Sequence, residues 1–479
     1  MNAPKSLRYV IRYELISLIR QRWLQSVGLI LMAFVVFAIF NGQSKVDQRL
    51  SDIKKAQLAV EEKDALGVVL LDSIEAGFTV DVPRWYMPDK PHVVGYNYLR
   101  VAAMPPGDMA IIATGQSDIY THYVQPKLYG ESFELNYTEL SSPVQLMFGS
   151  FDLSFVLIYL LPLIVIAFSY NILSAEREQG ILSVVASHPI SLFRWLLEKS
   201  LLRYMVLISM LVLLLIVSML VAGVPLFSDF GKTSVFLLLV IGYTLFWLLL
   251  SVLVNLRGQS SANNAVWLVA MWVILVLLVP SSLNQMANSL YPVPSRALLI
   301  NELRVVNAKA EEKADELLED FLRDHPELAG FEGGSRGWKE YFASQDLIKR
   351  EIQPVLNGYE ERLELQQEWV GQFRFLSPAL LLQHAFNEIS GTSTAHYEDY
   401  RHQVQEFAIV WRDFFLPMIF RGEEFKKSMM AELPEFEYQP IDDYSQSASH
   451  SLVLFGYCGL MLVVGLVLSR QKKTSLIIH

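Results

Sequence analysis

Residues 151–191 decide the fold, and they read FDLSFVLIYLLPLIVIAFSYNILSAEREQGILSVVASHPIS. Residues 153–173 carry no charge over about 20 positions, which is long enough for a helix to cross a bilayer core of roughly 30 Å. Residues 174–191 are too polar to follow them into lipid. The stretch therefore predicts a membrane span joined to a short amphipathic element outside the bilayer, where a soluble partner could apply force.

The rest of the chain has the composition of a membrane protein. Its 479 residues are 52% hydrophobic and only 18% charged, which is too apolar for an ordinary soluble protein. Six uncharged apolar runs approach the spanning length, with Asp152 at the border of the second. They predict transmembrane helices at residues 23–41, 152–173, 204–221, 234–254, 265–283 and 451–469.

Charge predicts the orientation. If both termini are cytoplasmic, the segments on that side hold 13 Lys or Arg and four acidic residues, whereas the two long external segments hold 25 basic and 43 acidic residues. Basic residues near span ends favour the cytoplasmic side. The formal net charge of −10 therefore belongs to the external parts, and it argues against nucleic acid as a partner. The cytoplasmic segments are 1–22, an amphipathic helix on membrane lipid, 174–203, a coupling element, 255–264, a loop, and 470–479, a tail.

The fold class that follows is an α-helical polytopic membrane protein with two extracytoplasmic domains. Residues 42–151 predict a mixed α/β domain, because a polar helical stretch precedes a proline-broken middle and a buried strand at 110–114. Residues 284–450 predict a mainly helical domain. Its helices are expected at 296–323, at 338–376 with an interruption at Pro354, at 378–389 and at 395–415. Residues 222–233 form a short external hairpin.

Two readings of the polar half of the opening stretch are open. Glu176, Arg177 and Glu178 put three charges at the membrane surface, and Gly180 permits a sharp reversal. An ordinary charged loop with membrane-dipping apolar residues would look similar. A short apolar helix that ends before the next span would instead suit contact with another protein.

The order of a span, Glu-Arg-Glu-x-Gly, a short apolar helix and a proline resembles the ABC-2 type permease family. Further motifs resemble a subgroup with two large periplasmic insertions, and they lie at residues 115–118, 376–379, 383–385, 389–392 and 411–415. The resemblance implies a bacterial inner-membrane exporter whose turn contacts a separate ATPase subunit that binds ATP and Mg. The coupling residues implied are Glu176, Arg177, Glu178, Gly180, Ile181, Leu182, Val185, His188 and Pro189.

Missing motifs also predict a role without catalysis. The chain has no Gly-x-x-x-x-Gly-Lys-Ser/Thr phosphate loop and no Gly-x-Ser-x-Gly elbow, so we expect neither ATP hydrolysis nor another enzyme activity in this chain, and no cofactor of its own. No charge inside a span offers an ion relay. His384 and Glu388 lie one helical turn apart, with His396 and His402 nearby, but no zinc motif surrounds them, so no metal site is expected.

The sequence thus predicts an ATP-driven permease subunit that works as a dimer with a second copy or a related permease. A candidate substrate path consists of Tyr159, Pro162, Tyr170, Asn171, Tyr243 and Trp247, although helix packing explains the aromatic members as well. Two alternatives are open: a mechanotransmission complex that acts on a periplasmic partner without transport, and a membrane sensor or scaffold that needs no ATPase.

Overall fold

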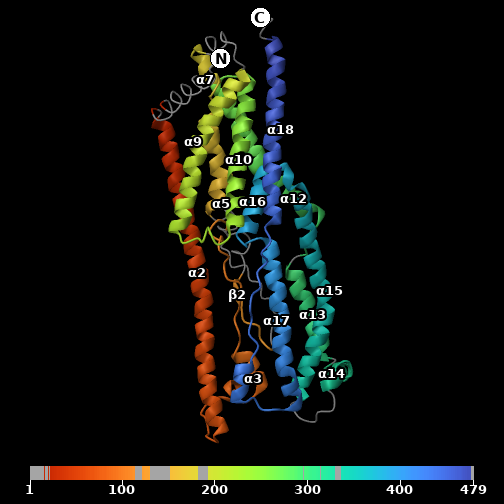
Figure 1. The fold of residues 1–479 in the computed structure, drawn as a ribbon. Coiled ribbons are helices and arrows are strands. Elements are labelled where there is room, and N and C mark those ends of the chain that lie inside the picture. The colour runs from red at the N-terminus through yellow and green to blue at the C-terminus, as the bar shows by residue number, and fades with distance from the viewer. Residues whose placement is uncertain are drawn as a thin grey trace.

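The structure is mainly helical and contains a membrane bundle with a long module below it (Figure 1). This computed structural model describes residues 22–113, 121–129, 151–181, 192–294, 296–312, 314–328 and 336–475, together with Ile16 and Arg20. Within that part of the chain, six helices are long and apolar enough to cross a membrane, which confirms an α-helical multi-pass membrane protein. They are Gln25–Glu75, Leu153–Glu178, Phe193–Val221, Phe230–Leu256, Ser261–Leu290 and Ser445–Arg470.

Helix α10 (Phe230–Leu256) lies in the middle of the bundle. It is apolar on all sides, as is typical of a helix buried in a protein core or in a membrane. Tyr243 and Trp247 on this helix are fully buried. Its neighbours are α6 (Leu161–Ser169), α9 (Leu192–Val221), α11 (Ser261–Trp272), α16 (Pro378–Ile389) and α18 (Ser445–Ser475).

Two of the spans contain a π-helical turn before a proline. The second span consists of α5 (Leu153–Phe155), η4 (Val156–Leu160) and α6, and the fifth of α11, η5 (Val273–Leu278) and α12 (Val279–Leu290). Because proline has no N–H, backbone carbonyls before Pro162 and Pro280 lose their helical donor. Tyr243 Oη donates to the Ile158 carbonyl at 2.9 Å, and a neighbouring helix thus supplies the missing bond.

Helix α2 (Arg22–Glu75) does not end at the membrane surface, where the predicted first span ended at residue 41. It continues as one helix of 54 residues along the side of the lower module (Figure 1). Residues 42–75 contain no proline, and the helix stops where Gly77 adopts a φ of 83°. The Phe78 N–H then bonds back to the Ser73 carbonyl at 2.9 Å, the usual closure of a glycine-terminated helix.

The described residues of the two long segments that the sequence predicts to be external form one module, here named the external module, around a shared hydrophobic core. The first segment contributes Leu71, Val94, Tyr98 and other residues, and the second contributes the aromatic face of α17 (Thr394–Arg421). Trp411 Nε1 donates to the carbonyl of Gly95 at 3.1 Å in α3 (Pro91–Asn97). Addition of a Cβ at Gly95 would bring it within 2.6 Å of Leu128, so this close approach requires glycine.

The first segment contains little strand where the structure describes it. β1 (Ala102–Ala103) pairs antiparallel with β2 (Tyr123–Val124), and η1 (Arg84–Tyr86) precedes α3. The predicted strand at 110–114 is wrong for its described part: residues 110–113 are buried, but they form a turn in which Ile112 N–H bonds to the Met109 carbonyl. A mixed α/β domain is therefore not shown.

The second segment is helical, as predicted, with different interruptions. Pro354 does not break α15, because Ile352 and Leu356 on either side of it are buried and packing offsets the lost hydrogen bond. Helix α16 begins and ends where predicted. The other elements are α13 (Arg296–Glu312), α14 (Ala314–Asp324), η6 (Pro326–Leu328), α15 (Arg336–Phe373), η7 (Arg374–Leu376) and η8 (Lys427–Glu432).

Helix α16 lies among the membrane helices, although the sequence predicted it in the external domain. Leu382 and Phe386 belong to the core of the bundle, and the Phe386 ring lies 5.4 Å from the ring of Phe236 on α10. Ser377, which caps α16, donates to the Leu275 carbonyl in η5 at 2.6 Å. The residue that caps α16 thus supplies a hydrogen-bond donor to a carbonyl in the π-helical turn of the fifth span.

Candidate functional site

The charged turn after the second span lies at the end of the bundle where α2 begins and α18 ends (Figure 1). It starts with the short helix α7 (Ser174–Glu178). Gly180 has a φ of 73°, so the sequence correctly predicted a reversal that favours glycine. The Gly180 N–H bonds to the Arg177 carbonyl at 3.0 Å and closes the turn. Ile181 follows with 46% of its surface exposed.

Glu176 fixes the turn to the third span. Its carboxylate accepts hydrogen bonds from Lys199 Nζ at 2.5 Å and from Trp195 Nε1 at 3.1 Å, both on α9. The side chains of Glu176 and Lys199 are each only 12% exposed. A charged pair at this depth is screened less than a surface pair, so loss of either partner costs more stability than it would at the surface. Glu176 therefore braces the protein internally.

Arg177 and Glu178 fix the same turn to the fourth and fifth spans. The Arg177 guanidinium donates to the carbonyl of Gly258, in the loop after α10. Glu178 accepts from the backbone N–H of Ser261 at 2.7 Å and from its hydroxyl at 3.0 Å. Ser261 is the first residue of α11, where free N–H groups and the helix dipole favour an anion. The three successive charges thus bond to three different places: α9, the loop after α10 and the start of α11.

A buried amide network lies directly beneath the turn. Asn255 on α10 donates to the Ser169 carbonyl at 3.1 Å and accepts from the Leu173 N–H at 3.3 Å. Asn264 on α11 donates to the Tyr170 carbonyl at 3.2 Å. Both asparagines are at most 2% exposed. These hydrogen bonds therefore join the end of the second span to the start of the fifth.

The sequence identified the turn but missed its internal partners. The sequence predicts a loop at 255–264, and the structure places Gly258 and Ser261 of this loop and the following helix against the turn. The sequence signal that indicates this packing is the composition of residues 255–264, which are small and polar with one charge. The expected contact residues Leu182, Val185, His188 and Pro189 lie outside the described residues.

The residues of the candidate substrate path fall into two groups. Tyr243, Trp247 and Pro162 are buried in the core of one bundle. Tyr159 packs against that core and lies 5.0 Å from Phe155, ring to ring. Tyr170 and Asn171 lie at the charged turn, where the Asn171 carbonyl accepts from Ala175 at 3.0 Å. A transport route through these residues stays a prediction.

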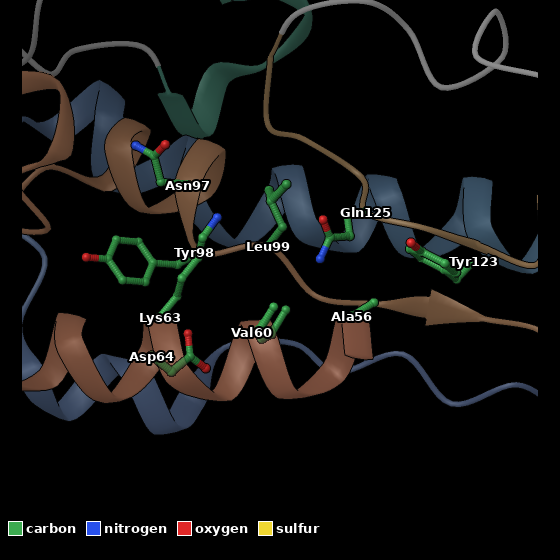
Figure 2. A pocket seen from close by; sticks show the side chains of 10 residues that line it. Ala56, Val60, Lys63, Asp64, Asn97, Tyr98, Leu99, Tyr123 and Gln125 are labelled. Carbon is green, nitrogen blue, oxygen red and sulfur yellow. The ribbon is translucent and has the colours of Figure 1, made fainter. Parts of the chain in front are cut away.

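A cavity of about 170 Å³ lies in the external module between α2 and the chain around Tyr98 (Figure 2). Figure 2 shows Val60, Lys63 and Asp64 of α2 opposite Tyr98 and Leu99. The Asp64 carboxylate pairs with Arg100 at 2.9 Å beside it. Pockets for drug-sized ligands usually exceed about 300 Å³, so this cavity suits at most a small molecule or water.

Comparison with known proteins finds a similarity over part of the second external segment. A family model described as a domain of unknown function, DUF3526, matches residues 296–439. These residues include α13 to α17 and η8, and therefore both the bundle-inserted α16 and the aromatic face of α17. Comparisons with curated proteins and with solved structures find no match.

Proposed function

We propose that this chain is the permease subunit of an ATP-driven ABC-2 type transporter in a bacterial inner membrane, with both termini cytoplasmic. A separate ATPase subunit would bind ATP and Mg and would contact the segment that begins at Ile181. A second copy or a related permease would complete the translocation path. The observation that supports this proposal most is the set of hydrogen bonds that Glu176, Arg177 and Glu178 form with the neighbouring spans, which we call the brace.

The brace gives the turn the properties that a force-receiving element needs. Its three charges are bonded to α9, to the loop before α11 and to α11 itself, so displacement of the turn moves three spans together. Exposed Ile181 follows immediately and has an apolar surface that a partner could cover. In this proposal, an exporter would use the movement to open a path between two copies.

Co-purification of a nucleotide-binding subunit tests this proposal. Ile181→Glu places a charge on the contact surface and should abolish co-purification of the ATPase and its stimulation by the permease. Ile409→Glu, at a 39% exposed isoleucine on α17, is the matched control and should leave both unchanged. Retention of the ATPase by Ile181→Glu, or absence of any ATPase from the native complex, would refute the assignment. The second result would favour a sensor or scaffold.

Orientation is tested with single cysteines. Cys458 is the sole cysteine of the chain and is 3% exposed, so an introduced cysteine reports alone on labelling by a membrane-impermeant reagent. Gln179→Cys, at an exposed position of the charged turn, should be protected in intact cells, and Phe227→Cys, in the hairpin after α9, should be labelled once the outer membrane is permeabilised. The reverse pattern would place the charged turn outside and exclude contact with a cytoplasmic ATPase.

A mechanotransmission complex is the second candidate, and α2 favours it. The helix is fixed near the membrane, where Asn41 Nδ2 donates to the Phe151 carbonyl at 2.8 Å. It is fixed again at its far end, where Lys427 Nζ pairs with Asp72 at 2.7 Å and Lys427 N–H bonds to Glu75 at 2.8 Å. Capture of a periplasmic protein by the external module, with no transported substrate, would favour this candidate over export.

A further inference from the structure

Three metal-binding side chains meet where α16 packs against α18. His384 and Glu388 lie one turn apart on α16, and His450 comes from the sixth residue of α18. One ligand atom from each residue lies within 4.8 Å of the other two. The rings of His384 and His450 are 5.2 Å apart, centre to centre. Since 62 positions separate Glu388 from His450, no local motif reveals the group.

His450 is the unusual member of this cluster. It is only 2% exposed, and neither of its ring nitrogens has a hydrogen-bond partner among the described residues. His384 Nδ1 is likewise buried without a partner. Buried polar atoms almost always have partners, because desolvation without a replacement bond is costly. A cation at this position would accept the lone pair of one nitrogen of each imidazole.

The donor set suits a divalent transition metal. Two imidazoles and one carboxylate with an open fourth position bind zinc in many proteins, whereas Mg²⁺ and Ca²⁺ prefer oxygen ligands alone. The Ser447 hydroxyl donates to one oxygen of Glu388, which orients the carboxylate as outer hydrogen bonds do for metal ligands. Ligands of a tetrahedral zinc lie about 3.4 Å apart, so ligand atoms that lie within 4.8 Å of one another must draw together by at most roughly 1.5 Å.

Arg374 competes with a metal for His384. Its Nη1 lies 3.2 Å from His384 Nε2. A guanidinium only donates, so in this arrangement Nε2 is the acceptor and Nδ1 carries the hydrogen. A cation on Nε2 would take the place of Arg374, and a cation on Nδ1 would move the hydrogen to Nε2 and break the same bond. The positive charge of Arg374 opposes a cation in either case.

We propose that His384, Glu388 and His450 bind one divalent transition-metal cation and thereby join α16 to α18. Arg374 turns away from His384 when the metal enters. Because Ser377 at the start of α16 also bonds to the fifth span, the cation would fix the external module to the bundle. The proposal does not depend on an ATPase partner.

Zinc binding by the full-length protein in detergent tests the proposal. Chelator-stripped protein should bind one Zn²⁺ per chain in competition with a chromophoric chelator, and Zn²⁺ should raise its melting temperature. His450→Gln and Glu388→Gln should each weaken binding by about 10- to 100-fold or more. Arg374→Gln should strengthen it by about tenfold, since it removes the opposing charge and leaves an acceptor for Nε2–H. Co²⁺ in the same site should give the absorption of a tetrahedral complex.

The chain supplies a matched control. His402 and Glu406 on α17 have the same spacing as His384 and Glu388, lie 3.4 Å apart and are largely exposed. His402→Gln should leave zinc affinity unchanged. If the buried His450→Gln variant fails to fold, partly exposed His384→Gln provides the same comparison. Equal affinities in His384→Gln and His402→Gln, or substoichiometric binding by the unmodified chain, would overturn the proposal.

Discussion

Tyr243→Phe tests whether the proline break in the second span is stabilised by a neighbouring helix. The substitution removes one hydroxyl, whose bond to the Ile158 carbonyl is 2.9 Å long, from a side chain with 0% exposure. Pro162, four residues after Ile158, offers no N–H to replace it. A buried acceptor without a partner costs about 1–3 kcal/mol, and interhelical bonds in membranes average somewhat less. We expect a loss of about 1–2 kcal/mol.

The double mutant makes this prediction specific. In Pro162→Ala the new N–H can bond to the Ile158 carbonyl, so Tyr243→Phe should cost little in that background. The small void left by the hydroxyl is the same in both backgrounds and cancels in the cycle. The wild-type protein, the two single mutants and the double mutant should therefore give a coupling energy of about 1–2 kcal/mol.

Equilibrium unfolding in mixed detergent micelles, followed by circular dichroism, measures the four free energies. Phe236→Leu is the control, because it alters a buried side chain on the same helix that packs against Phe386. It should show no coupling to Pro162→Ala. Equal costs of Tyr243→Phe with and without the proline would refute the idea that Tyr243 replaces the missing helical bond.

Three further predictions concern stability. Glu176→Ala should cost about 2–3 kcal/mol, less than a fully buried pair, and Glu176→Gln with Lys199→Met should restore part of the loss in the same unfolding assay. Burial lowers the pKa of His122 to about 3, below its value in the unfolded chain. The free energy of unfolding is therefore at its full value above pH 6.5 and decreases as the pH falls, because the unfolded state then binds the proton more strongly. By pH 5 about 2 kcal/mol should be lost, and His122→Gln should flatten the pH dependence of thermal unfolding. Tyr400→Phe, which removes a buried 2.8 Å bond to the β1 backbone, should cost about 1–2 kcal/mol, whereas exposed Tyr86→Phe should cost nothing measurable.

The spans and the turn were predictable because their signals are local. A charge-free run of about 20 residues identifies a span by length alone, and Gly180 after three charges indicates a reversal. The limits of α16 were also readable, because a Ser-Pro pair begins the helix and Gly391 follows its end. Each of these signals lies within one element.

The position of α16 and the shared external core were not predictable in the same way. A 12-residue apolar helix is too short to span a bilayer, so its length indicates a soluble core helix. Its insertion depends on Phe236 and Leu275, which are more than 100 positions away. The interruption predicted at Pro354 is wrong for a related reason. Proline usually breaks a helix, but tertiary packing keeps α15 continuous.

The length of α2 has a geometric consequence for movement at the membrane. Residues 42–75 extend about 50 Å beyond the predicted surface at 1.5 Å per residue, without a proline at which the rod could bend. A tilt of about 5° at the membrane would therefore displace the Glu75 end by roughly 4 Å. That displacement is comparable to a helical turn. In the mechanotransmission candidate, the helix would act as a lever arm, and Lys427, which bonds to Asp72 and Glu75 at its end, would carry the amplified motion into the far end of the external module.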